Sequence, residues 1–223
     1  MLTALSAIAS DQANPMETTL QHMKKLLDYV ATHHEAILTF RASDMVLAVH
    51  SDASYLSKPR ARSQAGGHFF MASDTEDPKN NGAVLNISTI VKAVMSLAAE
   101  AELGALYINS KETIIARHIL KVLGHKQPRT PVQSDNSTAI GVVINKIQPK
   151  RMKEMDMIFH WLRCRTNQKQ FRTYWRAGST NLADYVTKHH APIHHRTIRA
   201  LYLTAPTKLA QLRQNLQGKP FPH

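Results

Sequence analysis

Four carboxylates stand at positions where strands are expected to end or helices to begin. Asp52 follows the apolar run MVLAVH, Asp135 follows TPVQS, Asp184 comes just after the polar stretch STN, and Glu102 lies within a helical run. Each aspartate alone has a structural explanation, because Asp favours turns, helix N-caps and the first turns of helices. As a set, four carboxylates form an all-oxygen ligand group, which suits Mg²⁺ or Mn²⁺ better than zinc.

The helical run SLAAEAELGALY, residues 96–107, contains two acids that helix geometry separates. Residues two apart differ by about 200° around a helix, so Glu100 and Glu102 cannot face the same site. Glu102 falls on the apolar side with Ala98 and Ala105, where an unpaired charge is costly. We therefore expect Glu102 to be the metal ligand and Glu100 to be a solvated surface charge.

These four acids can meet at one edge of a sheet if the strand ends and helix starts lie together. In a strongly basic chain, such a nest of acids is most simply explained by metal ions that act on phosphate. Two divalent ions roughly 3.5 to 4 Å apart can activate a water molecule and stabilise the leaving oxygen of a phosphodiester. The sequence therefore predicts a two-ion phosphodiesterase site.

Hydrophobic periodicity predicts the elements that would position these acids. Strands are expected where apolar residues are dense or alternate, and helices where they recur every three or four residues. The predicted order β-β-β-α-β-α-α-β-α gives a mixed α/β fold with helices on the faces of a five-stranded sheet. The strands are expected at 45–54, 66–73, 83–90, 130–134 and 170–177, and the helices at 14–32, 94–123, 136–146 and 150–167, with a final helix opening at Asn181.

Composition limits the class of protein. The 223 residues include 28 Lys and Arg against 16 Asp and Glu, a net charge of +12, which is typical of proteins that bind phosphates. The single cysteine, Cys164, excludes an internal disulfide framework and a cysteine-rich zinc site. The opening MLTALSAIAS has neither the basic start of a signal peptide nor the length of a membrane span, so we expect an intracellular protein, cytoplasmic or nuclear.

Four motifs follow one another over about residues 42–195: HSDASY with ARSQAGGHFF after it, AAEAELGALY, QSDNSTAI and NLADYVTKHH. In this combination and order, the chain resembles the ribonuclease H domain of copia-type LTR retrotransposon Pol polyproteins. Residues 1–41 resemble the helix and linker at the end of the reverse transcriptase region, and residues 196–223 form a basic C-terminal tail. The aspartate pair of a polymerase site is absent from the sequence.

The resemblance implies the ribonuclease H-like fold, cleavage of the RNA strand of an RNA–DNA hybrid, and a site with two Mg²⁺ ions, or Mn²⁺. By motif, the metal-binding and catalytic residues would be Asp52, Glu102, Asp135 and Asp184. The reverse transcriptase domain of the same polyprotein would be a partner, and neither a membrane nor a small-molecule cofactor is expected. Cellular ribonucleases H usually carry a histidine before the last aspartate; here the loop WRAGSTNLAD has none, as is common in copia-type members.

Substrate binding is expected to use phosphates and 2′-hydroxyls in a shallow minor groove, without reading the bases. Singly, each basic residue is also explained as a solvated charge. Trp161, Trp175 and Phe171 are expected in the core. The candidate nucleic-acid-binding residues are Lys58, Arg60, Arg62, Lys146, Lys150, Arg151, Lys153, Arg163 and Arg165, with Lys169 and Arg172 further along.

Two other functions fit the same sequence. One is a catalytically inactive ribonuclease H-like module that binds nucleic acid or supports a polymerase. The other is a DNA strand-transfer enzyme such as an integrase, although those typically place Glu third among their acids. Separately, the segment KHHAPIHH, residues 188–195, contains imidazoles that can bind zinc, copper or nickel, but no cysteine pattern accompanies it.

Overall fold

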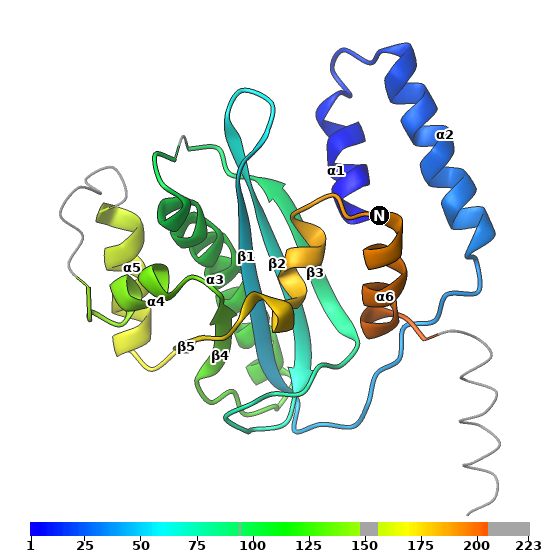
Figure 1. The fold of residues 1–223 in the computed structure, drawn as a ribbon. Coiled ribbons are helices and arrows are strands. Elements are labelled where there is room, and N and C mark those ends of the chain that lie inside the picture. The colour runs from blue at the N-terminus through cyan, green and yellow to red at the C-terminus, as the bar shows by residue number, and fades with distance from the viewer. Residues whose placement is uncertain (94, 148–155, 205–223) are drawn as a thin grey trace, which may run out of the picture.

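A mixed five-stranded sheet forms the centre of the protein. The computed structural model describes residues 1–93, 95–147 and 156–204. The strands run in the order β3-β2-β1-β4-β5, with β1 to β3 antiparallel and β1, β4 and β5 parallel (Figure 1). This arrangement confirms the predicted fold class. The strands are β1 (Val46–Lys58), β2 (Arg62–Ala72), β3 (Ala83–Ile90), β4 (Thr130–Ser134) and β5 (Phe171–Trp175).

Three helices cover one face of the sheet and enclose the main core. They are α3 (Ala98–Val122), α4 (Ser137–Val143) and α5 (Asp156–Asn167). Most strand residues that point to this face are buried, and the apolar ones among them form the core together with the helices. The core includes Leu47, Val49, Phe69, Leu103, Leu106, Val132, Leu162 and Phe171.

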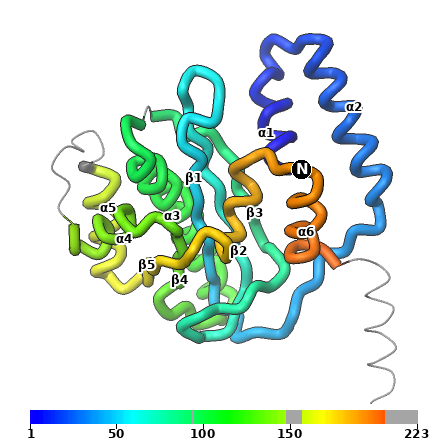
Figure 2. Tube along the Cα trace, viewed as in Figure 1, coloured from blue at the N-terminus to red at the C-terminus, as the bar shows by residue number. Residues whose placement is uncertain are grey.

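Shorter segments cover the opposite face. Three of them follow β5: the 3₁₀ helices η2 (Gly178–Thr180) and η3 (Leu182–Val186) and the helix α6 (Pro192–Tyr202). The first helix of the chain, α1 (Leu2–Ser10), lies beside them (Figure 2). The Thr3 hydroxyl donates a hydrogen bond to the Val186 carbonyl at 3.1 Å, which ties α1 to η3.

The predicted boundaries are close to the observed ones for the sheet and less so at the two ends of the chain. The α-helix expected to open at Asn181 is only the short 3₁₀ helix η3, and α1 was not predicted. Helix α6 runs through residue 195, where the resemblance ends. Within the described ranges, no helix is both long and apolar enough to cross a membrane.

The predicted amphipathic helix near the N-terminus exists as α2 (Glu17–Thr32). Its apolar stripe, formed by Leu20, Met23, Leu27 and Val30 at helical spacing, is exposed. Periodicity therefore identified the helix correctly, but it carries no information on which surface the stripe meets.

A pair of glycines in β2 lets segments approach the sheet closely from both faces. Gly66 is paired with Asp52, and a Cβ added there would lie 2.4 Å from Thr187 Cγ2. At Gly67, on the other face, an added Cβ would lie 2.3 Å from Asn109 Oδ1 of α3. Real Cβ atoms do not approach so closely, so the GG of this strand is needed for both segments to reach β1.

We predict that Gly66→Ala lowers the free energy of unfolding by about 1–3 kcal/mol, the usual range for overpacking a filled site. Urea denaturation measures this change. Gly104→Ala is the matched control, because its new Cβ would meet mainly the flexible end of Met95 at 3.0 Å. Alanine is also favoured over glycine in a helix by up to ~1 kcal/mol, so the control should be neutral or stabilising. Equal stability of the two variants would contradict the packing explanation.

Candidate metal centre

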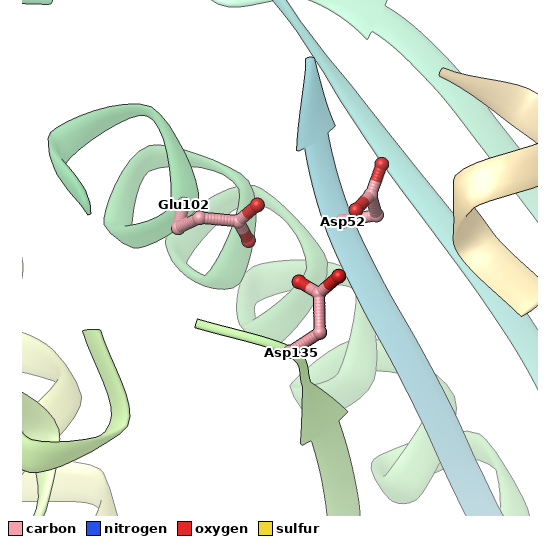
Figure 3. Close-up of side chains that lie close together, drawn as sticks. All are labelled: Asp52, Glu102 and Asp135. Carbon is pink, nitrogen blue, oxygen red and sulfur yellow. The ribbon is translucent and has the colours of Figure 1, made fainter. Parts of the chain in front are cut away.

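Three of the four predicted carboxylates meet at the end of β4. Asp52 lies on β1, Glu102 on the second turn of α3, and Asp135 directly after β4, and one oxygen from each lies within 4.8 Å of the others (Figure 3). The register explains the meeting of the two aspartates: His50 pairs with Gln133, so Asp52 and Asp135 both come two residues later on parallel neighbours. Strand β1 continues past this point whereas β4 ends, which opens the edge at which the acids gather.

The carboxylates of Asp52 and Glu102 are almost completely buried, with 1% and 6% of their surface exposed. The backbone N–H of Ala53 donates to Glu102 Oε1 at 3.1 Å, and the Ser134 hydroxyl donates to Oε2 at 3.4 Å. The Thr187 hydroxyl donates to Asp52 Oδ2. These donors orient both groups but do not supply a positive charge.

Burial and mutual repulsion disfavour the ionised forms of these acids. Desolvation, followed by the charges of Asp52 and Asp135, raises the pKa of Glu102 to about 9. Desolvation also raises the pKa of Asp52 to about 7, against the opposing effects of the Thr187 hydrogen bond and the Lys188 charge. Carboxylates crowded in this way ionise readily only when a cation joins them.

The donor set therefore fits a hard divalent cation. All three groups offer carboxylate oxygens, the ligands that Mg²⁺ and Mn²⁺ prefer. Among the residues that the structure describes, this is the one set of three or more His, Cys, Asp or Glu side chains placed closely enough to share an ion. The four histidines at 189–195 thus form no such set. His190 Nε2 lies 3.3 Å from the backbone oxygen of Asp184, and its ring stacks on those of Tyr185 and His194.

Asp184, the fourth predicted acid, lies near the cluster but outside it. Its carboxylate forms an ion pair with Lys188, four residues later, and Lys188 Nζ also lies 4.0 Å from Asp52 Oδ2. Desolvation lowers the pKa of this lysine, but the hydrogen bond with Asp184 and the acids Asp52, Asp184 and Asp135 outweigh it and raise that pKa. The ammonium group is the positive charge closest to these acids in the described structure.

Helix geometry assigned Glu102 to the correct face, but the expectation for Glu100 was wrong. Glu100 is buried, with 6% of its surface exposed, and accepts hydrogen bonds from the backbone N–H groups of Ser96 at 2.7 Å and Leu97 at 3.3 Å. It therefore satisfies unpaired donors at the start of α3, where a carboxylate is also favoured by the helix dipole.

Comparison with known proteins agrees with the resemblance in the motifs. No protein-family model matches the chain. The chain is 26% identical over 185 residues to the Retrovirus-related Pol polyprotein from transposon TNT 1-94 of Nicotiana tabacum. The match covers 83% of this chain but only 13% of that polyprotein's length. The predicted relation to a retrotransposon Pol polyprotein is thereby confirmed.

Two solved structures with a similar fold are ribonuclease H domains. LC11-RNase H1, isolated from compost, gives a TM-score of 0.47 at 12% identity, covering 64% of this chain and 92% of that one. The N-terminal RNase H domain of rv2228c from Mycobacterium tuberculosis gives 0.46 at 12% identity, covering 64% and 91%. At such scores and identities these likenesses carry no information on activity.

Several residues that shape the site were missed from sequence. Ser134 and Thr187 orient the acids, and Gly178 makes room for one: a Cβ there would lie 2.6 Å from Asp135 Oδ2. Thr187 and Lys188 belong to the motif NLADYVTKHH, so the motif marked their segment without indicating their contacts. Ser134 likewise belongs to the motif QSDNSTAI, whereas Gly178 lies outside the four motifs.

The predicted basic residues occupy different settings. Lys58, Arg60 and Arg62 lie at the β1–β2 hairpin, which extends β1 beyond Asp52 (Figure 1). Arg163 instead donates to the carbonyls of Val142 at 2.7 Å and Ile147 at 3.0 Å, and so it holds α4 and α5 together. Lys146 is exposed after α4, Arg165 stacks on Trp161, and Lys150, Arg151 and Lys153 lie outside the described residues.

The three aromatic residues expected in the core differ in their environments. Phe171 is buried in the main core, as predicted. Trp161 is partly buried and packs edge-to-face on Tyr107, with ring centroids 5.1 Å apart. The expectation for Trp175 was wrong: 54% of its surface is exposed, because β5 ends there and the covering helices do not reach it.

The raised pKa values predict that the metal-free protein loses stability as the pH rises. The folded protein keeps protons that the unfolded chain releases near pH 4. The contribution of these protons is complete below that pH and is lost as the pH passes about 7 for Asp52 and about 9 for Glu102. In EDTA, the melting temperature should therefore fall across this range, and Glu102→Gln should reduce the fall.

The exposed Glu112 on the same helix provides the control, since Glu112→Gln removes one carboxylate outside the cluster. Its melting profile should follow that of the unmodified protein. Mn²⁺ added at alkaline pH should raise the melting temperatures of the unmodified protein and of Glu112→Gln, because a ligand that binds only the folded state stabilises it. It should raise the melting temperature of Glu102→Gln by less, because that variant lacks one of the ligands. Parallel profiles for all three proteins would contradict the site.

Proposed function

We propose that this chain is a divalent-cation-dependent ribonuclease H that hydrolyses the RNA strand of RNA–DNA hybrids during retrotransposon reverse transcription. The observation that carries the proposal is the convergence of Asp52, Glu102 and Asp135, from three separate motifs, within 4.8 Å. The ordered motifs of a copia-type ribonuclease H and the similarity to a Pol polyprotein support it. Mg²⁺ is the proposed ion, with Mn²⁺ as a substitute.

The cluster would hold the cations through Asp52, Glu102 and Asp135, with Asp184 completing the ligand set. Bound divalent cations would supply Lewis acidity toward the attacking water and the leaving 3′ oxygen of the phosphodiester. The chain's own residues fix the geometry: Ala53 and Ser134 hold the Glu102 carboxylate, and Thr187 holds that of Asp52. The hydrophobic core beneath keeps them in place without rearrangement during the reaction.

The substrate would lie across the edge where these acids gather, with the β1–β2 hairpin contacting its phosphates. Such contacts position a duplex without reading its sequence, and recognition of RNA would use the 2′-hydroxyls in the minor groove. Residues 1–41 would represent the end of a reverse transcriptase region, 42–195 the nuclease domain and 196–223 a basic tail. The reverse transcriptase domain would be the partner in the longer polyprotein.

One observation favours a second candidate, a binding module without nuclease activity. Asp184 is paired with Lys188 and does not belong to the three-carboxylate cluster. If this ion pair persists when cations and substrate are present, the fourth ligand stays unavailable. Such a chain would bind hybrids and leave them uncut.

Asp52→Asn tests the nuclease proposal. It should abolish Mg²⁺-dependent hybrid cleavage and keep the fold, because Asn has nearly the shape of Asp and burial already disfavours the charged form of Asp52, whose pKa is raised. The assay uses a labelled hybrid, a DNA duplex and an RNA duplex, each with Mg²⁺ or EDTA, and circular dichroism reports the fold. Asp28→Asn, on the exposed surface of α2, is the control.

Cleavage restricted to the RNA strand of the hybrid and sensitive to EDTA is the expected result for the unmodified chain and the control. Undiminished cleavage by Asp52→Asn would refute the site. Binding of the hybrid without cleavage by the unmodified chain would favour the binding module, and strand transfer on the DNA duplex would indicate an integrase-like enzyme.

Replacing Lys58, Arg60 and Arg62 with Gln should weaken hybrid binding and flatten its salt dependence. Each lost phosphate contact lowers the slope of log K against log salt by ~0.9, so three contacts lower it by up to about 3. Fluorescence anisotropy in EDTA measures the slope. The control replaces Lys121, Lys126 and Arg129, which are exposed near the amino end of β4, away from the acids. Equal slopes for the two triple variants would mean that the hairpin does not contact the phosphates of the hybrid.

A further inference from the structure

Trp175 is a large exposed aromatic residue at the carboxyl end of β5. Alternation along the strand places it on the same face as Phe171 and Thr173, both of which are buried beneath the helices. As the last residue of the strand, Trp175 passes the limit of that cover and has 54% of its surface exposed. Exposing so large an apolar ring forgoes the stabilisation that burial would give.

The indole is held in position by a hydrogen bond. Its Nε1–H donates to the backbone oxygen of Asp135 at 2.8 Å. The strand also anchors it, because Trp175 pairs with Ser134 and the N–H of Arg176 donates to the Ser134 carbonyl at 3.2 Å. The polar group of the ring is thus used internally, and the surface left to a ligand is apolar.

This ring lies beside the acidic cluster. Its hydrogen-bond acceptor is the backbone of Asp135, and its paired residue Ser134 contacts Glu102. Strands β1, β4 and β5 are parallel neighbours, and Asp135 and Trp175 lie at the carboxyl ends of β4 and β5. Asp52 lies at the same level on β1, so all three residues lie along the same edge of the sheet. A nucleic-acid strand with a phosphate at the cluster would extend over adjacent positions on that edge.

The chemistry of a hybrid duplex indicates which part of it meets the ring. Its bases are paired and stacked, and its minor groove presents ribose rings and 2′-hydroxyls. A flat apolar surface without a free donor matches the carbon face of a sugar. Together with the nearby carboxylates, it complements a sugar–phosphate unit whose phosphate is neutralised by cations.

We propose that Trp175 is a substrate-positioning residue whose indole packs against a sugar of the nucleic-acid strand bound at Asp52, Glu102 and Asp135. This inference rests on the proposed nuclease function and adds a contact to it. The ring contributes affinity and alignment of the strand, and it takes no part in proton transfer or cation binding.

The tryptophan content of the chain allows a direct test, because Trp161 and Trp175 are the only two. Trp161→Phe leaves Trp175 as the single emitter, and Trp175→Phe leaves Trp161, which already packs against Tyr107 and Arg165. Acrylamide quenching of each variant is measured in an Asp52→Asn background with Mg²⁺, with and without a saturating hybrid, because that change should prevent cleavage while Glu102 and Asp135 remain to hold a cation. Saturation is established separately by anisotropy of the labelled hybrid.

The hybrid should lower the quenching constant of Trp175 by about twofold or more, because contact would cover a ring that is 54% exposed. The quenching constant of Trp161 should stay unchanged. No protection of Trp175 at saturation would overturn the inference, and equal protection of both tryptophans would overturn it too, since that pattern indicates non-specific coating.

Kinetics separates a contact from a structural role. Trp175→Ala should raise the KM for the hybrid by about tenfold with a smaller change in kcat, because the lost contact is one made equally in the bound substrate and in the transition state. Trp175→Phe keeps a ring without the N–H donor and should recover most of the affinity. Near-ultraviolet circular dichroism confirms that each variant is folded.

The outcomes distinguish this inference from the proposed function. Cleavage of the hybrid with an unchanged KM for Trp175→Ala would leave the nuclease function standing and remove Trp175 from the substrate surface. Protection of Trp175 by a hybrid that the unmodified chain does not cleave would keep the contact and refute the nuclease function.

Discussion

The repulsion among three crowded carboxylates, two buried and one half-buried, is the interaction on which the rest of this structure depends. Asp52, Glu102 and Asp135 lie within 4.8 Å of one another, where the interior screens their charges poorly. Burial, together with repulsion from neighbouring acids, favours the protonated forms in the absence of a cation, and it raises the pKa of Glu102 to about 9 and that of Asp52 to about 7. Such an arrangement lowers stability, and it persists because the surrounding fold holds the backbone in place.

The fold holds these acids from two sides of one sheet. Helix α3 brings Glu102 from the face that contains the main core, and η3 brings Thr187 to Asp52 from the other. Gly66 and Gly67 permit both approaches, because a side chain at either would collide with Thr187 or Asn109. The packing of both layers therefore offsets the unfavourable free energy of the crowded carboxylates, because contacts far from the acids fix each segment in place.

The sequence predicted those features that depend on periodicity and local chemistry. Alternating apolar residues located all five strands, and the angle between neighbouring helix positions selected Glu102 over Glu100 as the residue facing Asp52. The burial of Glu100 could not be predicted in this way, because it arises from unpaired N–H groups at the start of α3 and not from the apolar face. The exposure of Trp175 likewise depends on where the covering helices end, and strand periodicity does not contain that information.

A basic chain with an acidic centre has a physical consequence for binding. In the proposed enzyme, the net charge of +12 would attract a nucleic acid to the surface, whereas the three carboxylates would repel a phosphate beside them. A cation at the cluster would change that repulsion into attraction, so that cation binding and hybrid binding would each strengthen the other by the same free energy. Lys188 already places one positive charge beside the cluster, through its contacts with Asp184 and Asp52. In the proposed enzyme, selection of the productive phosphate follows from this coupling, because only a phosphate at the cluster gains from the cation while the others meet the diffuse positive surface.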